Sequence, residues 1–405
     1  MLVVSVMVEI KSFDHQGRGI GKIDNKVVFV KNALPGEIVE IIVNDEKKKF
    51  MEASIKKINK TSKNRIKPMC PYFEKCGGCN LMHISYENQL NFKKEKIENI
   101  VTKYLNQEIR VNNIVKSSNE LNYRNKITFQ VNNNIGFYEE KTNNFIKIDK
   151  CLICNDIINK SIKYLNRLEL KSINKIICKN INNKLMIIVD TNNKNLDISC
   201  LKEIADSIYI KDNGNYLLKY GQEYEEGHID NYSFTISPDS FFQINLDVAT
   251  KILKKIKNEV GCNNTILDLY CGTGIIGIYI SDNNKVIGVE INKQAYLDAL
   301  NNKKNNKLSN IDFICNDSGK SIKELNINPD IVIIDPPRGG LNSETIKNIL
   351  ELEAKKIIYV SCNPITLVRD LNHLKDKYTI SEITPFDMFP QTYHVECIAI
   401  LNKNN

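Results

Sequence analysis

The sequence of 405 residues has no run of about 18 consecutive apolar residues, the length that a membrane-spanning helix needs. This absence excludes a protein that crosses a membrane by helices. The apolar start, residues 1–10, is short, lacks a basic region and leads directly into Lys11. We therefore expect a strand there and not a secretion signal, and we expect a cytoplasmic protein without a membrane partner.

The absence of a secretion signal also decides how the twelve cysteines are interpreted. In a reducing compartment, cysteines indicate free thiols, metal ligands or catalysis and not disulfides. Three of them, Cys70, Cys76 and Cys79, have the spacing C-x5-C-x2-C. A four-thiolate site needs one more cysteine, which Cys151 or Cys154 offers, and such a set suits either an iron–sulfur cluster or structural zinc.

The overall composition constrains the number of domains and the class of partner only weakly. With 42% hydrophobic residues the chain is able to bury proper cores, and its length suggests about two to three domains. The net charge of +8 permits a nucleic-acid partner. A solvated lysine-rich surface explains the same charge almost as well.

Residues 266–290, ILDLYCGTGIIGIYISDNNKVIGVE, carry the strongest local pattern. A β-branched run at 266–270 predicts a buried strand, and residues 271–274 form a glycine turn. A helix at 275–281 and a second strand at 286–289, which ends at Glu290, complete a βαβ nucleotide-binding unit. We expect Glu290 to accept hydrogen bonds from the ribose hydroxyls of an adenosine.

Two ligands fit this unit. Gly272, Gly274 and Gly277 match the G-x-G-x-x-G pattern of a nicotinamide dinucleotide site. Against a dinucleotide, the Asp268 carboxylate near the strand end would repel a diphosphate, whereas it suits the cationic groups of S-adenosylmethionine. The sequence Asp-Pro-Pro-Arg at 335–338 follows a predicted strand at 331–334 and resembles a methyltransferase motif. We therefore expect S-adenosylmethionine.

Earlier in the chain, short β-rich runs alternate with turns. Strands are predicted at 3–10, 26–30, 38–43 and 53–58, with turns at 17–21 and 34–37, which suggests a small OB-like barrel. This stretch resembles a TRAM domain, an RNA-binding module. A helix is predicted at 86–104, and strands and short helices alternate from 123 to 229. The basic segment 123–126 either contacts RNA or forms a turn packed on the core.

A second chemical centre lies near the C-terminus. A predicted strand at 356–360 ends in Ser-Cys-Asn-Pro, which places Cys362 at the carboxyl edge of a sheet. The helix that begins at Pro364 is expected to favour the thiolate of Cys362. A last strand at 394–400 would carry His394 and Glu396 on one face, and a carboxylate beside a nucleophilic cysteine is a general-base arrangement. A buried structural cysteine is the alternative.

Residues 241–245, Phe-Phe-Gln-Ile-Asn, open the C-terminal part. On an extended segment Phe241, Gln243 and Asn245 alternate onto one side. A planar ring next to an amide is able to stack on a nucleobase and to hydrogen-bond its edge. A core phenylalanine and a helix cap are the alternative for the same residues.

Together these motifs resemble the RNA uracil-5 methyltransferase family, and within it the 23S rRNA branch with a TRAM domain and a cluster. The resemblance runs from the barrel through CPYFEKCGGC, FFQIN, DLYCGTG, DPPRGG and SCNP to HVE. It implies Cys362 as nucleophile and Glu396 as base, and uracil binding by Phe241 and Gln243. It implies a donor site of Gln243, Asp268, Tyr270, Gly272, Gly274, Glu290, Asp317 and Asp335. It also implies a 4Fe–4S cluster on Cys70, Cys76, Cys79 and Cys151, with Cys151 preferred over Cys154.

The implied architecture has three parts: a TRAM barrel at 1–58, a central α+β domain with the cluster at 59–232, and a Rossmann-like methyltransferase domain at 233–405. The helix near 86–104 is expected to pack on the catalytic domain. RNA is the expected partner, with no obligate protein partner. A tRNA uracil-5 or an RNA cytosine-5 methyltransferase remains open, although the Asp-Pro-Pro motif has no cysteine of the kind that the cytosine enzymes use.

Two more distant functions fit less well. In an amino-nitrogen methyltransferase an aromatic residue would follow Asp-Pro-Pro, where this chain has Arg338, and Cys362 would have no role. An iron–sulfur RNA sensor with a decayed catalytic domain would lack donor-site residues, whereas all of them are present.

Overall fold

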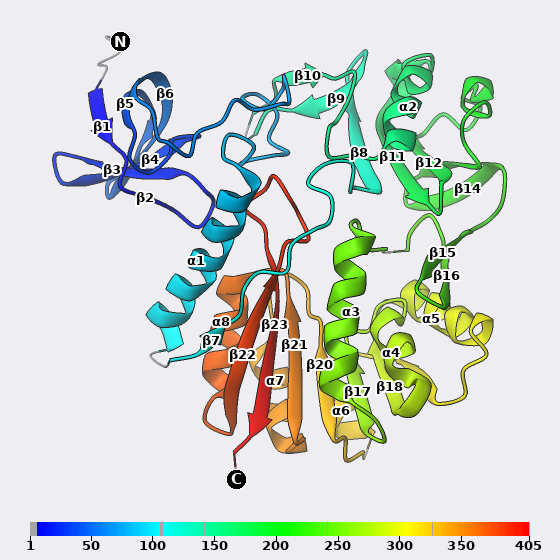
Figure 1. Ribbon diagram of the computed structural model, residues 1–405. Coiled ribbons are helices and arrows are strands. Elements are labelled where there is room, and N and C mark those ends of the chain that lie inside the picture. The colour runs from blue at the N-terminus through cyan, green and yellow to red at the C-terminus, as the bar shows by residue number, and fades with distance from the viewer. Residues whose placement is uncertain (1–5, 106–107, 141, 241, 326, 405) are drawn as a thin grey trace. The chain divides into compact units, whose positions relative to one another are not determined.

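The computed structural model describes residues 6–105, 108–140, 142–240, 242–325 and 327–404 (Figure 1). The chain divides into two compact units. The first unit comprises Met1–Lys96, Phe137–Ile146 and Phe389–His394, and the second comprises Ile97–Gly136, Lys147–Met388 and Val395–Asn405.

The first unit is built on a six-stranded sheet in the order β1-β5-β6-β4-β3-β2. Its apolar side chains, among them Val8, Val28 and Ile41, form a small core of their own. The strands are β1 (Val6–Glu9), β2 (Ser12–Phe13), β3 (Gly19–Ile23), β4 (Lys26–Lys31), β5 (Ile38–Glu46) and β6 (Phe50–Lys60).

The expected turn at 17–21 is only partly correct, because β3 begins at Gly19. Gly17, with a φ of 77°, turns the chain, whereas Gly19 and Gly21 lie in β3 and allow close packing. A Cβ atom on Gly21 would lie 2.2 Å from Cγ1 of Val8, so no larger residue fits at this crossing of β1 and β3.

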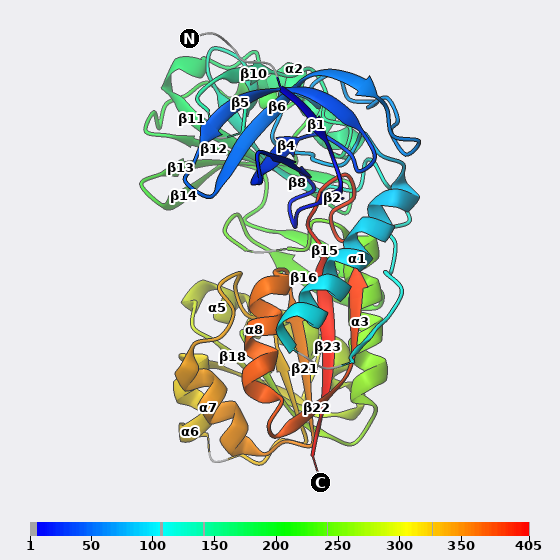
Figure 2. The ribbon, with the colours of Figure 1, turned by 90° about the vertical axis from the view of Figure 1, so that its left-hand side faces the viewer.

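The second unit contains an eight-stranded sheet in the order β19-β18-β17-β20-β21-β23-β22-β7 (Figure 2). The strands from β19 to β21 run parallel, and β23 runs antiparallel to β21. The strands are β7 (Arg110–Val111), β17 (Thr265–Leu269), β18 (Lys285–Glu290), β19 (Ile311–Cys315), β20 (Ile331–Ile334), β21 (Lys356–Ser361), β22 (Tyr378–Phe386) and β23 (Glu396–Lys403).

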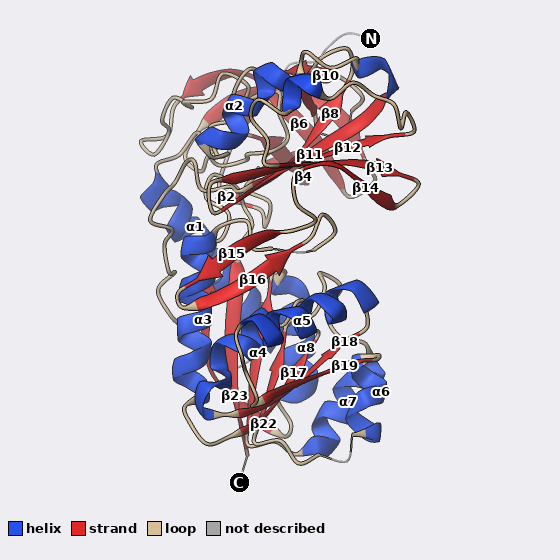
Figure 3. Cartoon of the chain, turned by 90° about the vertical axis from the view of Figure 1, so that its right-hand side faces the viewer, coloured by secondary structure: helices blue, strands red, loops and turns tan. Residues whose placement is uncertain are grey.

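Helices cover both faces of this sheet, with α3, α4 and α5 on one face and α6, α7 and α8 on the other (Figure 3). On the second face Ile97, Val101 and Leu105, from the C-terminal half of α1, join the apolar core of the sheet. The helices are α1 (Tyr86–Leu105), α3 (Leu246–Val260), α4 (Ile275–Ile280), α5 (Lys293–Asn305), α6 (Ser318–Glu324), α7 (Ser343–Leu352) and α8 (Pro364–Leu374).

A second sheet, in the order β10-β9-β8-β11-β12-β13-β14, precedes the eight-stranded one in the chain, and the hairpin β15-β16 follows it. The strands are β8 (Lys126–Val131), β9 (Ile135–Tyr138), β10 (Phe145–Lys147), β11 (Ile173–Ile181), β12 (Lys184–Thr191), β13 (Ser207–Asp212), β14 (Asn215–Tyr220), β15 (Glu225–Ile229) and β16 (Tyr232–Ile236), with helix α2 at Asp156–Leu165. No helix in the described part of the chain is long and apolar enough to cross a bilayer.

The βαβ unit predicted at 266–290 is confirmed as β17, α4 and β18. The predicted start of the last strand is wrong, because β23 begins at Glu396 and not at His394. The neighbouring strands explain this difference. β21 ends at Ser361 and β22 at Phe386, so neither offers a pairing partner for residues before Glu396.

Candidate active site

The candidate active site lies at one edge of the eight-stranded sheet. Because β17, β18, β19, β20 and β21 are parallel, the residues at their carboxyl ends meet at this edge. Leu269 pairs with Val289 and with Ile334, so Tyr270, Glu290 and Asp335 follow one another across three neighbouring strands.

Cys362 and Glu396 meet at the same edge. In the antiparallel pair β21·β23 the last register partners are Ser361 and Cys397. Cys362 directly follows Ser361 and Glu396 directly precedes Cys397, so the two residues adjoin this last pair. The Glu396 carboxyl group is close enough to Cys362 to raise the pKa of its thiol. Two residues far apart in the sequence therefore bring a thiol beside a carboxyl group.

The electrostatic state of Cys362 differs from the expectation. The helix start at Pro364 was expected to favour the thiolate, yet the pKa of the Cys362 thiol is raised. Burial is the largest cause, and the nearby carboxyl group of Glu396 raises the pKa further. Arg338 lowers the pKa of the thiol through its charge and through hydrogen bonding to the sulfur. Each of these two effects is smaller than the effect of burial and than that of Glu396.

Three acids share this edge, the buried Asp268 and Glu396 and the half-buried Asp335. Burial and the neighbouring Asp335 raise the pKa of Asp268 to about 8, and burial raises that of Asp335 to about 7. Burial and Asp335 raise the pKa of Glu396 well above its ordinary value. The edge therefore has a surplus of acids that a bound cation would help to ionise.

The glycine turn after β17 leaves open space. Gly272 and Gly274 have φ of 56° and 81°, and a Cβ on Gly272 would meet nothing within 4 Å. The Glu290 carboxylate accepts hydrogen bonds from the amides of Gly272, at 2.9 Å, and Asn292, at 2.6 Å. Tyr270 has a φ of 62°, which is strained for a large side chain and typical of functional turns.

These residues fit S-adenosylmethionine. Asp268 is fully buried, and neither of its carboxyl oxygens reaches a described hydrogen-bond donor with good geometry, although the approach of the Gly277 amide partly lowers its pKa. A buried acid without a full set of partners indicates a missing positive group. The sulfonium and ammonium of the donor supply positive charge, and the open turn admits the molecule.

The remaining predicted donor residue, Asp317, follows β19 and is the N-cap of α6. Its side chain accepts a hydrogen bond from the amide of Lys320 at 3.1 Å. It lies beyond Cys315, which pairs with Glu290 in the neighbouring strand. The structure thus places Asp317 at the same edge, with two strands, β18 and β17, between it and Asp335.

Gln243 is half-buried and precedes α3, whereas the predicted base-stacking residue Phe241 lies outside the described residues. For Asn245 the helix cap, which the sequence left open as an alternative, is confirmed. Asn245 is buried and caps α3, with its side-chain amide donating to Ser117 Oγ at 3.1 Å and to the Met388 carbonyl at 3.3 Å. Capping α3 and bonding two neighbouring segments leave Asn245 turned into the protein.

Arg338 was not among the predicted site residues, although it directly follows the Asp-Pro-Pro motif. Its backbone carbonyl accepts hydrogen bonds from Asn363 Nδ2 at 3.1 Å and Thr366 Oγ1 at 3.2 Å. The same loop is fixed by Asp370, which accepts hydrogen bonds from the Leu341 amide at 2.8 Å and the Tyr359 hydroxyl at 2.7 Å. The start of α8 therefore positions Arg338 beside Cys362, which precedes this helix.

The basic segment at 123–126 is packed on the core and does not form a turn, because Arg124 forms a β-bridge with Cys154 and Lys126 begins β8. Tyr123 and Asn125 are buried, and Asn125 bonds the chain just before α3 through both its backbone and its side chain. Packing on the core was one of the two alternatives that the sequence left open. Like the position of Arg338, the bonding of Asn125 to the segment before α3 was not revealed by the sequence.

The cysteine motif in the first unit forms a turn-rich loop. Cys70, Cys76 and Cys79 are all partly exposed, and the amide of Gly78 donates to Cys76 Sγ at 3.4 Å. Amide donors to sulfur are typical of thiolate clusters. Among the described residues the structure shows no group of three or more His, Cys, Asp or Glu side chains arranged to bind a metal. The chemistry of the donor set suits a cluster, and its geometry does not establish one.

In the second unit, Cys151 and Cys154 differ in state. Cys151 is partly exposed, and hydrogen bonding from the Cys154 thiol lowers its pKa to about 7. Cys154 is fully buried, and its thiol pKa is raised by that bond and by burial. Of the two, Cys151 is the more accessible thiolate and hence the better ligand.

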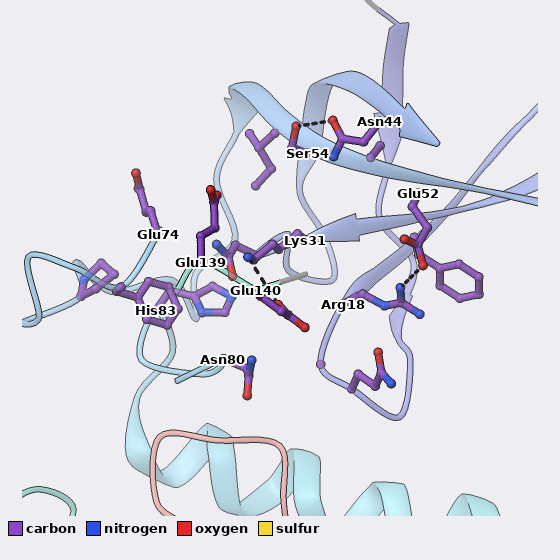
Figure 4. Close-up of a pocket in the computed structure, with 18 of the residues that line it drawn as sticks. Arg18, Lys31, Asn44, Glu52, Ser54, Glu74, Asn80, His83, Glu139 and Glu140 are labelled. Atoms are coloured by element: carbon purple, nitrogen blue, oxygen red, sulfur yellow. Dashed lines mark hydrogen bonds and ion pairs between the residues drawn. The ribbon is translucent and has the colours of Figure 1, made fainter. Parts of the chain in front are cut away.

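The first unit also contains an open cavity of about 840 Å³ between strands and the cysteine loop (Figure 4). Arg18 lies 4.6 Å from the centroid of the Phe29 ring and pairs with Glu52 at 2.8 Å. Lys31 pairs with Glu140 at 3.4 Å. His83 lines the cavity, with neither ring nitrogen bonded to a described residue.

Comparison with known proteins agrees with this geometry. A family model described as tRNA (Uracil-5-)-methyltransferase matches residues 219–404, and a TRAM domain model matches residues 3–56. A Staphylococcus aureus protein named as an uncharacterized RNA methyltransferase is 34% identical over 433 residues, covering 96% of both chains. A Clostridium acetobutylicum protein of the same description is 33% identical, covering 97% of this chain and 96% of its own.

Among solved structures, the chain resembles the Pyrococcus abyssi tRNA (uracil-54, C5)-methyltransferase in complex with S-adenosyl-L-homocysteine. The TM-score is 0.81 and the identity 28%, with 98% of this chain and 100% of the other covered. The chain therefore belongs to the RNA uracil-5-methyltransferase family. It is an S-adenosylmethionine-dependent RNA methyltransferase with an N-terminal TRAM domain.

Proposed function

We propose that the protein methylates carbon 5 of a uridine in RNA, most specifically in 23S rRNA, with Cys362 as nucleophile and Glu396 as base. The observation that supports this proposal is the pairing of β21 with β23, because these two residues adjoin its last register pair, Ser361 with Cys397. A thiol beside a buried carboxyl group suits addition to a pyrimidine followed by removal of a proton.

Each residue has a defined task in this scheme. The Cys362 sulfur would bond to carbon 6 of uracil, and the electron pair of the 5,6 double bond would move toward the carbonyl at carbon 4. Carbon 5 would then accept a methyl group. Glu396 would take the proton from carbon 5, the double bond would reform, and the carbon–sulfur bond would break to release the thiolate.

The raised pKa of Glu396 agrees with the role of base, because a carboxylate of higher pKa is a stronger proton acceptor. Arg338 would favour the thiolate before addition. Bound S-adenosylmethionine supplies the electrophilic methyl group. This donor would be bound by Asp268, Glu290, Asp317 and the turn at Gly272 and Gly274. The site for the donor and the uracil would also be lined by Tyr270, Asp335 and Gln243.

The uracil must leave its stack to enter such a site. Phe241 and Gln243 would receive it, by stacking and by hydrogen bonds to its edge. The TRAM domain would contribute a further RNA contact. We propose domain limits of 1–58, 59–232 and 233–405 for the three parts.

We also propose a 4Fe–4S cluster on Cys70, Cys76 and Cys79, with Cys151 as the fourth thiolate. The supporting observations are the exposure of these sulfurs, the Gly78 amide on Cys76 and the low pKa of Cys151. Iron and sulfide analysis of anaerobically purified protein tests this. We expect four irons per chain in the wild type and loss of iron in Cys76→Ala, whereas bound zinc would contradict the proposal.

Transfer RNA is the second candidate substrate, since the Pyrococcus abyssi protein with the same fold carries the name of a tRNA methyltransferase. Nucleoside mass spectrometry separates the two. Unmodified 23S rRNA and unmodified tRNA are each incubated with the enzyme and donor. We expect 5-methyluridine in the rRNA alone. 5-Methyluridine in tRNA alone would move the proposal to tRNA, and 5-methylcytidine would contradict the uracil assignment.

A further inference from the structure

The buried lysine Lys179 lies on β11, outside the predicted site, and is only 3% exposed. Its ammonium donates to three backbone carbonyls, those of Ser237 at 3.1 Å, Pro238 at 2.8 Å and Ser240 at 2.9 Å. An ammonium has three donors, so each finds an acceptor. All three acceptors belong to one turn.

This turn leads directly into the segment that carries Gln243. Asn125, just before β8, fixes the following residues: its side chain donates to the Gln243 carbonyl at 2.8 Å, and its backbone amide donates to the Ile244 carbonyl at 3.0 Å. The amide of Asn180, the residue after Lys179, donates to the Asn125 carbonyl at 2.7 Å. One connected set of bonds from Asn125 and β11 thus fixes the turn at 237–240 and the chain at Gln243 and Ile244.

A negative charge lies on the other side of the turn. Asp298 of α5 is buried and accepts a hydrogen bond from Ser240 Oγ at 2.6 Å. Ser240 Oγ also accepts a hydrogen bond from the Ser237 amide at 2.9 Å. The turn is therefore held between the Lys179 ammonium and the Asp298 carboxylate, and neither of these groups lies among the predicted site residues.

We propose that Lys179 is a positioning residue for methyl transfer, which fixes the turn 237–240 so that Gln243 is held ready to bind the uracil. The proposal rests on the proposed function, through the role of Gln243. A buried ammonium is costly unless hydrogen bonds compensate it, and Lys179 uses all three of its donors on this one turn.

The charge of Lys179 responds to pH. Burial and the neighbouring Lys126 lower its pKa to about 7, while Asp239 and Asp298 raise it to a smaller extent. Loss of the proton would leave only two donors for three carbonyls. The positioning effect should weaken as the ammonium deprotonates.

The test compares Lys179→Met with Lys175→Met, a control on the same strand whose lysine is partly exposed. We expect Lys179→Met to lower kcat/KM for RNA by about 10- to 100-fold, because a misplaced contact costs rate, and to lower the melting temperature as well, because three carbonyls lose their donor. Lys175→Met should match the wild type. A Lys179→Met variant with wild-type kcat/KM would overturn the proposal.

A double-mutant cycle with Gln243→Ala separates positioning from a general structural role. If Lys179 acts through Gln243, Lys179→Met should cost little once Gln243 is removed. Fully additive losses would overturn the proposal. Should Lys179→Met not fold, Lys179→Gln takes its place with the same two criteria. A wild type that makes no methylated nucleoside would instead overturn the proposed function, and this inference with it.

Discussion

Cys362 and Glu396 directly adjoin the last register pair of the antiparallel strands β21 and β23, Ser361 with Cys397, and the Glu396 carboxyl group raises the pKa of the Cys362 thiol. The loop after β20 adds Arg338 beside the thiol. The proposed nucleophile, the proposed base and a cation that favours the thiolate are thus all positioned by a few adjoining strands. Each of the following predictions changes one element of this arrangement.

Cys362→Ala should still bind S-adenosylmethionine and transfer no methyl group. The donor site is built by β17 and β18, whereas carbon 5 of uracil is a poor nucleophile without thiol addition. We expect a loss of turnover of about 10⁴-fold or more, measured as tritium transfer from labelled donor. Cys262→Ala, an exposed cysteine in the same domain, is the matched control. Substantial turnover by Cys362→Ala would refute the covalent scheme.

Arg338→Met should make the Cys362 thiol less reactive. The guanidinium is the main group that lowers the pKa of this thiol, so its removal leaves burial and Glu396 unopposed. Alkylation of Cys362 by iodoacetamide, followed by peptide mass spectrometry, should slow by about tenfold near neutral pH. Arg338→Lys should restore part of the rate. Equal rates in all three proteins would show that Arg338 does not act on the thiol.

Donor affinity should rise with pH. Asp268, with a pKa of about 8, and Asp335, with a pKa of about 7, are largely protonated in the free enzyme below these values, and a cationic donor favours their ionised forms. Binding therefore releases protons, and the Kd for S-adenosylmethionine should fall as pH rises from about 6 to about 8. Calorimetry should show that the Kd for S-adenosylmethionine depends less on pH in Asp268→Asn than in the wild type. In Asp330→Asn, at the opposite edge of the sheet, the pH dependence of this Kd should equal that of the wild type.

The stability of the free enzyme should follow the opposite trend. Because the folded pKa of Asp268 is raised, its contribution to stability is present below the unfolded pKa of about 4 and is lost as pH rises to about 8. The melting temperature should thus respond less to pH in Asp268→Asn than in the wild type between about pH 5 and about pH 8. Scanning calorimetry without donor measures this, and parallel curves for the two proteins would contradict the raised pKa.

Much of this arrangement was predictable because it is local in sequence. The glycine turn, Glu290 and the Asp-Pro-Pro motif each follow a buried strand, and a parallel sheet necessarily brings such strand ends together. The placement of Cys362 at the sheet edge followed from the same rule. The closeness of Cys362 to Glu396 did not follow from this rule. β22 lies between β21 and β23 in the chain, and only the pairing of β21 with β23 brings the two residues together.

The features that sequence reasoning missed share one physical cause, which is contact with distant parts of the chain. The pKa of Cys362 was expected from the nearby helix start, but burial and a residue from a distant strand dominate it. For Asn245 the sequence left a helix cap open as an alternative, and tertiary contacts with Ser117 and Met388 hold its side chain inside the protein. Lys179 gave no signal at all, because one lysine in a lysine-rich sequence reveals neither its burial nor its acceptors.

The most direct test of the account is mass spectrometry of Glu396→Gln after incubation with RNA substrate and S-adenosylmethionine. Without the base, carbon 5 keeps its proton after methyl transfer and the thiolate is not expelled. We predict a stable adduct of methylated uridine on the peptide that contains Cys362, and none in the double variant that also carries Cys362→Ala. A fully active Glu396→Gln enzyme, or an adduct on another cysteine, would contradict the account.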